Sequence, residues 1–276
     1  MRSYVAGVDE VGCGCLAGPV VAAAVVLKDV RDIQVLEEYR LYYHPNEQPF
    51  SRLIRDSKKM SPIMREAASA ALREHYAYDY SVGFSEVDEI DRYGVVDASL
   101  LAMMRAVMGL RTKPVGLKVD GVREVPRLEG IAQQVIIRGD TTEKCISAAS
   151  IIAKVARDHY MVDVSPRFPD YRFADNKGYP SPAHLRALYE WGPCDIHRIS
   201  TAPVRRAIEL QQDRDYRTVQ DGDIVRVEAT LEIPLDPLEW GDNSYEDVVR
   251  HLRLHPDALH SLWKRYTEQA RMEIKE

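Results

Sequence analysis

Residues 4–27 read YVAGVDEVGCGCLAGPVVAAAVVL, two apolar runs separated by a glycine-rich turn. The runs at residues 4–8 and 20–27 are short and rich in valine, which is typical of β-strands. Because a short connection joins them, they are expected to pair antiparallel in one sheet. The first run leads directly into Asp9 and Glu10, so this stretch also places two acidic side chains at a strand end.

Outside this stretch, the same kinds of pattern predict further strands and helices. Short apolar runs predict strands at residues 78–84, 115–119 and 134–137. Helical spacing of apolar residues predicts a helix that begins at Ser61-Pro62, and further helices over residues 98–110 and 146–161. The expected order is β-β-β-α-β-α-β-α, an α/β layered fold.

The character of the chain changes near residue 211. Residues 211–276 hold 9 of the 37 Lys and Arg residues and 15 of the 43 Asp and Glu residues, so they carry the whole net charge of −6. We therefore expect one large domain in residues 1–210 and an acidic extension, a small helical or α+β appendage, in residues 211–276. Residues 37–50 are expected to form a surface loop.

Two classes of protein are disfavoured by composition. The longest apolar stretch, residues 16–27, is shorter than the roughly 20 residues that a membrane-spanning helix needs, and the acidic pair before it is unlike a secretory signal. We expect a soluble cytoplasmic protein with no membrane partner. The cysteines form no C-x2-C pair or Cys/His run, so reduced thiols are expected in place of a zinc site. They are Cys13, Cys15, Cys145 and Cys194.

Acidic residues recur at the ends of the predicted strands. Asp9 and Glu10 follow the first strand, Asp120 the fourth and Asp140 the fifth. Side chains from distant segments converge at strand ends in α/β folds, and four carboxylates in one cleft need cations between them. Oxygen ligands without histidine favour Mg²⁺ or Mn²⁺, and two such ions about 3.5–4 Å apart can promote phosphodiester hydrolysis. Each acid is also a common turn former or helix cap, and spacing alone leaves that alternative open.

A series of motifs runs in order across residues 4–208. They are VDEVGCG at 8–14, LAGPV at 16–20, RDSKKMSP at 55–62, EVDEI at 86–90, VDG at 119–121, RGD at 138–140, ISAASIIAKVARD at 146–158, KGYP at 177–180, HRIS at 197–200 and APV at 202–204. Together they resemble the ribonuclease HII family, the type 2 ribonucleases H. The resemblance implies a ribonuclease H-like fold, with a mixed five-stranded sheet flanked by helices, as the catalytic domain.

The resemblance also implies an activity. A protein of this family is expected to be a metal-dependent endoribonuclease that hydrolyses the RNA strand of RNA–DNA hybrids. It is also expected to nick duplex DNA 5′ of embedded ribonucleotides, leaving a 3′-hydroxyl and a 5′-phosphate. Its partners would be those two nucleic acids, and its cofactors would be Mg²⁺ or Mn²⁺ in a two-ion site. Carried over by motif, the catalytic and metal-binding residues are Asp9, Glu10, Asp120 and Asp140.

Substrate contacts follow from the same motifs. The loop of Gly12, Cys13 and Gly14 is implied to read the ribose 2′-hydroxyl largely through its backbone, which glycines let approach closely. Tyr179 matches the family's tyrosine that stacks on the neighbouring sugar. Such residues set substrate preference, whereas phosphate contacts position the duplex without reading sequence. The candidate phosphate contacts are Lys58 and Lys154.

Other polar residues in these motifs are expected to have structural roles. Asp158 is left out of the metal set, because Lys154 lies four residues earlier on the same helix and an ion pair accounts for it. His197 and Arg198 are expected to form a polar network that anchors the C-terminal helices.

One departure from the family pattern opens alternatives. The family's loop normally reads Gly-Arg-Gly, and Cys13 has neither the charge nor the donors of arginine, so ribonucleotide recognition is expected to be weaker or altered. A second hypothesis is that the chain is a catalytically weakened nucleic-acid-binding or scaffold module that acts through its tail. The retention of all four acids opposes it. A third alternative keeps the fold and takes DNA junctions or ends as substrate. The acidity of residues 211–276 suggests a protein partner or self-association, and a solvated lid is equally consistent with it.

Overall fold

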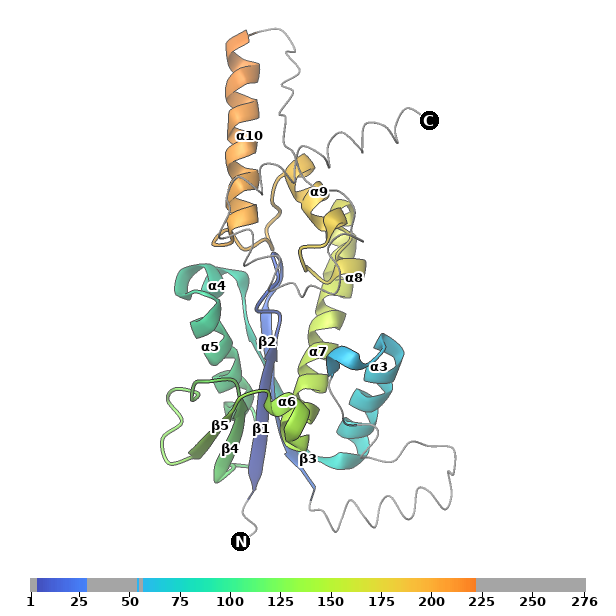
Figure 1. Ribbon diagram of the computed structural model, residues 1–276, viewed down its shortest axis with the longest axis vertical. Helices are drawn as coiled ribbons and strands as arrows, with labels where there is room; N and C mark the ends of the chain where they lie inside the picture. The colour runs from blue at the N-terminus through green and yellow to red at the C-terminus, as the bar shows by residue number, and fades with distance from the viewer. Residues whose placement is uncertain (1–3, 29–53, 55–56, 222–276) are drawn as a thin grey trace. The chain divides into compact units, whose positions relative to one another are not determined.

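Five strands form one sheet at the centre of the computed structural model, which describes residues 4–28, 54 and 57–221 (Figure 1). The strands are β1 (Val5–Val11), β2 (Val20–Leu27), β3 (Ala77–Ser85), β4 (Gly116–Asp120) and β5 (Ala132–Ile136). Their order across the sheet is β3-β2-β1-β4-β5. β1, β2 and β3 pair antiparallel, whereas β4 runs parallel to both β1 and β5. The predicted mixed five-stranded sheet, and the antiparallel pairing of its first two strands, are confirmed.

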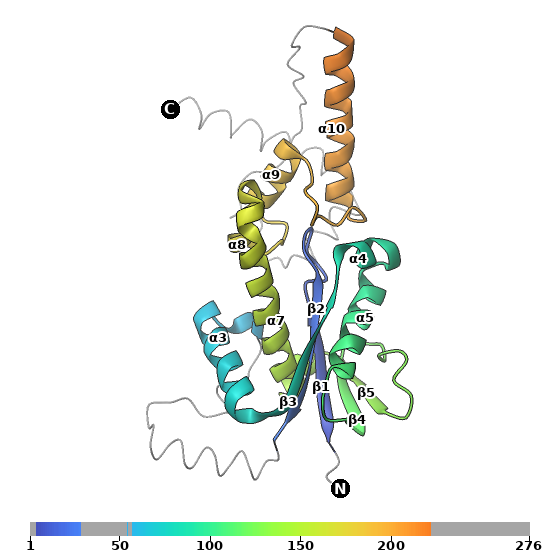
Figure 2. The same cartoon turned by 180° about the vertical axis from the view of Figure 1, so that it is seen from behind.

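Helices cover both faces of this sheet (Figures 1 and 2). The described helices are α3 (Pro62–Ala71), α4 (Val87–Tyr93), α5 (Val95–Met108), α6 (Gly139–Thr142), α7 (Lys144–Val164), α8 (Phe173–Asn176), α9 (Pro182–Trp191) and α10 (Ala202–Asp221). Short helical turns are η1 (Ser57–Lys59), η2 (Leu72–Tyr76), η3 (Ser165–Arg167) and η4 (Pro169–Tyr171). α4 and α5 lie on one face, and α3 and α7 lie on the other. The predicted start of α3 is confirmed, because the Ser61 hydroxyl caps it by accepting from the Met64 amide at 3.3 Å.

The expected order β-β-β-α-β-α-β-α is wrong in two places, although the residue ranges predicted for the individual elements follow the observed order. α3 precedes β3, and β5 follows β4 with no helix between them. Residues 121–131 make the parallel crossover without a helix, and Val125 within that loop is buried in the core, where a helix would otherwise supply apolar cover. α4 was not predicted, although it begins with a capping box between Glu86 and Glu89. α9 and α10 correspond to the C-terminal helices that were expected without bounds.

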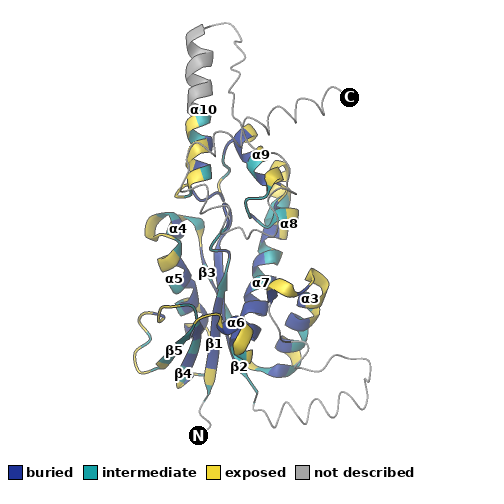
Figure 3. Cartoon of the chain, in the orientation of Figure 1, coloured by how far each residue is buried: buried dark blue, intermediate teal, exposed yellow. Residues whose placement is uncertain are grey.

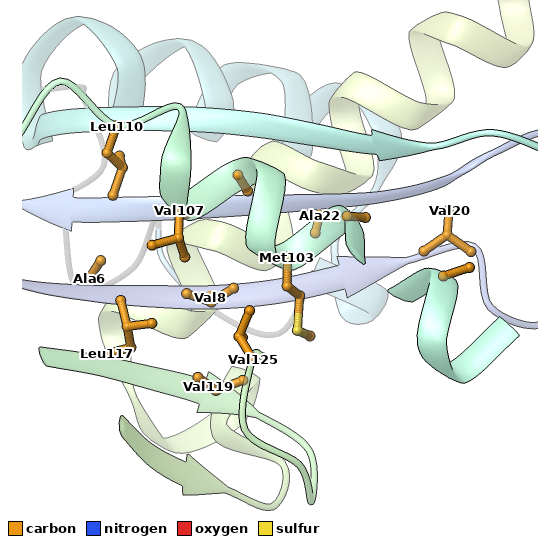
Figure 4. Close-up of a cluster of buried hydrophobic side chains, with 14 of the residues drawn as sticks. Ala6, Val8, Val20, Ala22, Met103, Val107, Leu110, Leu117, Val119 and Val125 are labelled. Atoms are coloured by element: carbon orange, nitrogen blue, oxygen red, sulfur yellow. The ribbon is translucent and has the colours of Figure 1, made fainter. Parts of the chain in front are cut away.

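Alternation along β2 divides the core into two layers. The first layer faces α5 and includes Ala22 and Ala24 of β2, together with Met103 and Val107 of α5 (Figure 4). The second layer takes the intervening Ala23 and Val25 and packs them against α3 and α7. β2 is therefore buried on both faces, which explains its continuous apolar run (Figure 3).

Small residues let α7 approach the sheet closely. A Cβ atom added to Gly7 of β1 would collide with the backbone of Cys145 and Ile146 at the start of α7. Because β1 carries Asp9 and Glu10, this close approach brings the first turns of α7 beside both acids.

The acidic extension lies almost entirely outside the described residues. Contacts within the chain divide it after Gln212, and α10 runs on to Asp221. The expected boundary at 210/211, the expected surface loop at 37–50 and the predicted extension therefore stay predictions. Within the described residues, none of the helices combines the length and the hydrophobicity that a bilayer crossing requires. All four cysteines are free thiols, as predicted.

Two histidines are buried in a third, aromatic cluster. His184 of α9 and His197 are 0% and 2% exposed, and Tyr171 and Phe173 pack around both rings. Burial lowers the pKa of both imidazoles, and the pKa of His197 falls to about 3. Both rings are therefore neutral in the folded protein at neutral pH.

We expect this burial to make folding stability depend on pH. In the unfolded chain His197 takes up a proton as pH falls below 6.5, while in the folded chain it stays neutral down to about 3. The unfolded state then binds more protons, so the free energy of unfolding falls by up to about 1.4 kcal/mol for each pH unit below 6.5.

Urea denaturation at pH 7, 6 and 5 checks this prediction. The difference between the parent and His197→Asn isolates the histidine, since the carboxylates are common to both proteins. The control is Met108→Leu, because Met108 carries no titratable group and is 68% exposed, so it should leave the pH dependence unchanged. An equal pH dependence in the parent and His197→Asn would contradict the expectation.

Candidate active site

A pocket of about 120 Å³ brings together acidic, basic and hydroxyl side chains from distant segments. Its lining residues are Asp9, Glu10, Val11, Ser57, Lys58, Asp120, Asp140, Ser150, Lys154 and Tyr179. They come from β1, η1, β4, α6, α7 and the turn before α9. All four acids predicted as catalytic line this one pocket, as do Lys58, Lys154 and Tyr179.

The acids reach the pocket from positions that differ in part from those expected. β1 continues to Val11, so Asp9 and Glu10 lie within the strand and do not follow it. Asp120 is the last residue of β4, as predicted. Asp140 lies in the first turn of α6, and β5 has already ended at Ile136. The strand-end expectation for Asp140 is wrong because Arg138, in the left-handed conformation, turns the chain into α6.

Hydrogen bonds hold these acids in position. Asp120 Oδ1 accepts from the Gly139 amide at 2.6 Å, which ties the end of β4 to the start of α6. Asp9 Oδ1 accepts from the Glu10 amide at 2.8 Å. The Ser147 hydroxyl of α7 donates to the backbone carbonyl of Asp140. These contacts thus hold Asp9, Asp120 and the backbone of Asp140 in place.

Burial and mutual repulsion raise the pKa values of three of the acids that line the pocket. Burial raises the pKa of Asp9 well above its usual range, and the charges of Glu10 and Asp120 raise it further. Burial and Asp120 raise the pKa of Glu10, while burial and Asp140 raise that of Asp120. The pocket therefore concentrates negative charge that a bound cation or a proton would balance.

These residues fit divalent cations by their chemistry. The donors are carboxylate oxygens, with Ser57 and Ser150 hydroxyls beside them, a set that hard ions such as Mg²⁺ and Mn²⁺ prefer. Lys58 Nζ lies 3.9 Å from Asp140 Oδ2, but its side chain is 84% exposed and balances little of the buried charge. Within the described residues, no three His, Cys, Asp or Glu side chains are already arranged to hold an ion.

Lys154 and Tyr179 also line the pocket. Lys154 Nζ lies 5.2 Å from the centre of the Tyr179 ring and donates to Asp158 Oδ1 at 2.7 Å. Asp158 also accepts from Arg65 at 3.2 Å, so it serves as an ion-pair partner, as the sequence predicted. Arg65 in turn donates to the carbonyls of Ser57 and Met60 and so braces the turn that carries Lys58.

The predicted glycine loop lies beside the pocket but does not line it. Cys13 Sγ is 3.7 Å from Glu10 Oε1 and donates to it, and burial raises the pKa of the thiol to about 12. Gly12 has a φ of +95°, and a Cβ atom there would collide with the Arg157 guanidinium. Arg198 donates to the carbonyls of Cys13 and Gly18, so it ties this loop to the segment that leads into α10. His197 contacts His184 of α9 at 3.0 Å, and these contacts agree with the polar network expected at the C-terminal helices.

Sequence reasoning missed three residues that shape the site. Ser57 and Ser150 hydroxyls lie 2.9 Å apart at the pocket wall. Arg157 is fully buried and donates to three backbone carbonyls in two segments, those of Ala17 and Pro19 and that of Lys177. All three lie inside motifs that the resemblance contained, but no spacing rule marked them, because their partners lie about 90 to 140 residues away.

Comparison with known proteins agrees with this geometry. Residues 6–202 match the family profile described as Ribonuclease HII. The chain is 46% identical over 204 residues to the ribonuclease HII of Verminephrobacter eiseniae, a match that covers 74% of this chain and 88% of that protein.

Two solved structures are also similar. The ribonuclease H2 of Pyrococcus horikoshii superposes with a TM-score of 0.59 at 25% identity, covering 76% of this chain and 99% of that one. The ribonuclease HII in a complex with PCNA from Archaeoglobus fulgidus has a TM-score of 0.53 at 25% identity, covering 68% and 86%.

Proposed function

The chain belongs to the ribonuclease HII family, and on that premise we propose that its carboxylate pocket cuts ribonucleotide-containing strands with the help of divalent metal ions. It is a type 2 ribonuclease H, an endonuclease with ribonuclease H activity. The proposed substrates are the RNA strand of RNA–DNA hybrids and single ribonucleotides in duplex DNA, nicked on their 5′ side, in the cytoplasm. The observation that carries the proposal is the convergence of Asp9, Glu10, Asp120 and Asp140 with Tyr179 in one pocket.

The four carboxylates would hold Mg²⁺ or Mn²⁺. When bound, a pair of such ions supplies an activated water and stabilises the leaving oxygen. The buried Asp9 provides a fixed anionic edge, and Glu10 and Asp120 complete it, because each is oriented by backbone or neighbouring contacts. Water adds to phosphorus as the bond to the 3′ oxygen breaks, which leaves a 3′-hydroxyl and a 5′-phosphate.

The remaining residues of the site would select the substrate. The Gly12–Gly14 backbone is proposed to contact the 2′-hydroxyl, the group that distinguishes RNA from DNA. Tyr179 would stack on the neighbouring sugar, and Lys58 and Lys154 would contact phosphates. Lys154 suits that role because it lines the pocket and Asp158 holds its ammonium in place.

A nicking assay tests this function directly. The substrate is a labelled duplex with one ribonucleotide, and the controls are the all-DNA duplex and a chelator. We expect a single cut 5′ of the ribonucleotide that requires Mg²⁺ or Mn²⁺ and is absent from the all-DNA duplex. Absence of cutting at high enzyme concentration would favour the alternative of a scaffold that acts through residues 211–276. Cutting of the all-DNA duplex would favour the DNA-processing alternative.

Cys13 allows a separate prediction about recognition. Cys13→Arg restores the residue usual in the family, and we expect it to raise the preference for the ribonucleotide duplex over all-DNA by about tenfold. The reason is that one added charge-assisted hydrogen bond contributes about 1.5 kcal/mol. Rates on both duplexes measure it, and Cys13→Ser, which keeps a donor toward Glu10 without a charge, is the matched control. An unchanged preference would show that the backbone alone reads the sugar.

A further inference from the structure

The backbone carbonyl of Tyr179 receives two hydrogen bonds. The Ser181 amide donates to it at 2.7 Å, and the His184 ring contacts it through Nδ1 at 2.8 Å. The Tyr179 amide donates to the Asn176 carbonyl at 2.9 Å. The main chain at this tyrosine is therefore held on both sides, and one of the holding groups is a buried imidazole.

His184 belongs to a hydrogen-bonded pair with His197. The two Nε2 atoms lie 3.0 Å apart, and the other ring nitrogen of each histidine faces a backbone group of fixed polarity, with the Cys194 thiol also 3.1 Å from His197 Nδ1. The Cys194 amide can only donate, and it lies 2.9 Å from His197 Nδ1. The Tyr179 carbonyl can only accept, and it faces His184 Nδ1.

These fixed polarities leave one arrangement of protons for two neutral rings. His197 Nδ1 accepts from the amide, so the proton of His197 is on Nε2. His184 Nδ1 donates to the Tyr179 carbonyl, so its Nε2 is bare and accepts from His197. The result is a one-way chain of hydrogen bonds from the Cys194 amide through both rings to Tyr179.

Because the two rings are buried, any donor or acceptor in this chain of hydrogen bonds that lacks a partner would destabilise the fold. Both rings are at most 2% exposed, so water does not compete for their nitrogens. The ring centroids of Phe173 lie 5.2 Å from His184 and 5.7 Å from His197, and Tyr171 lies 4.8 Å from His197. Two apolar side chains could fill the same space without burying any group that needs a hydrogen bond.

We propose that His184 is a positioning residue that sets the place of Tyr179 at the pocket, with His197 locking the His184 ring in the tautomer that donates to Tyr179. The inference rests on the proposed function, in which Tyr179 contacts the sugar beside the ribonucleotide. The Tyr179 ring lies within 5.2 Å of Lys154 Nζ and 5.6 Å of the Arg157 guanidinium carbon, so a small backbone shift displaces it from both. A displaced ring loses its alignment with the bound sugar.

Two conservative substitutions separate positioning from packing. The amide nitrogen of asparagine reaches about as far as Nδ1 of histidine, so His184→Asn keeps a donor for Tyr179 and leaves the His197 Nε2–H without an acceptor. Glutamine reaches about as far as Nε2, so His184→Gln accepts from His197 and leaves Tyr179 without its side-chain donor.

The two variants should therefore rank oppositely in stability and in selectivity. We expect His184→Gln to be the more stable in urea denaturation, yet to lower the ratio of kcat/KM for the single-ribonucleotide duplex to that for the RNA–DNA hybrid about tenfold. His184→Asn should be the less stable, yet keep that ratio within about twofold of the parent. If the less stable variant, His184→Asn, also had the lower ratio of kcat/KM values, the proposal would be overturned.

A double-mutant cycle tests whether the effect of His184→Gln on the ratio depends on the Tyr179 side chain. In a Tyr179→Ala background, His184→Gln should change the ratio less than twofold, because the group that it positions is gone. An undiminished tenfold effect would overturn the proposal. If Tyr179→Ala alone leaves the ratio unchanged, the proposed role of Tyr179 fails and the inference fails with it. If Tyr179→Ala changes the ratio and His184→Gln does not, the inference alone fails.

Should His184→Gln not fold, His197→Asn tests the same chain from its other end. It keeps an acceptor for the Cys194 amide and removes the Nε2–H that locks the His184 tautomer. We expect about a threefold fall in the ratio, and an unchanged ratio in a folded variant would overturn the proposal.

Discussion

Replacing Asp9 with asparagine is expected to abolish cleavage and, at the same time, to stabilise the metal-free protein. The change removes a charge at nearly constant shape. We expect kcat to fall at least about a thousandfold, which corresponds to about 4 kcal/mol of transition-state stabilisation. In the absence of metal, Asp9 is buried beside Glu10 and Asp120, whose charges already raise its pKa. Loss of that repulsion should raise the melting temperature by a few degrees, at about 2–4 °C for each kcal/mol.

Two measurements check this expectation. Single-turnover nicking at saturating Mg²⁺ or Mn²⁺ gives the rate, and thermal unfolding with a chelator gives the stability. Asp163→Asn, on the exposed part of α7, is the control and should alter neither. Full activity of Asp9→Asn would refute a role for Asp9 in metal binding. A lowered melting temperature would show that Asp9 supports the fold in its own right.

Replacing Arg157 with methionine is expected to have the largest effect on stability. The guanidinium is fully buried and donates to the carbonyls of Pro19, Lys177 and Ala17 at 2.9, 2.8 and 3.0 Å. Each buried acceptor left without a partner costs about 1–3 kcal/mol, so we expect a loss of at least about 3 kcal/mol. Because this side chain packs against Gly12 and donates to the Lys177 carbonyl, the loop and the Tyr179 turn should also lose their alignment.

Urea denaturation measures the loss, and the nicking assay measures preference for the ribonucleotide duplex. Arg123→Met is the matched control, because that side chain is 61% exposed and should change stability by less than about 0.5 kcal/mol. Arg157→Lys should recover only part of the stability, since one ammonium cannot replace three directed donors. Equal stability of Arg157→Met and the parent would contradict this account.

Much of the fold was predictable because local patterns carry it. The continuous apolar run of β2 and the valine-rich β1 are local signals of buried strands, and the capping Ser61 marked the start of α3. The ordered motifs indicated the family, and the family in turn indicated the mixed sheet. The written order of elements placed a helix between β4 and β5, whereas the predicted residue ranges and the structure both leave that parallel crossover without one.

The candidate site was predictable to a different degree in each of its parts. Acids at Asp9, Glu10 and Asp120 follow apolar strand residues, a pattern visible in the chain. Asp140 was named from its motif, but its place in α6 depends on a left-handed turn at Arg138 that no spacing rule indicates. Cys13 was noticed only because the family usually has arginine at that position. Its contact with Glu10 depends on how the loop folds and could not be predicted from the sequence.

The sequence by itself determined which residues are acidic, which segments are strands and which family the motifs resemble, because each of these depends on neighbours along the chain. Only the tertiary structure decided how the recognition half of the pocket is held. Arg157 reaches carbonyls up to 140 residues away, and His184 and His197 orient each other inside an aromatic cluster. Buried polar residues obey no periodicity, since their partners are chosen by three-dimensional proximity and by the need to satisfy every buried donor and acceptor.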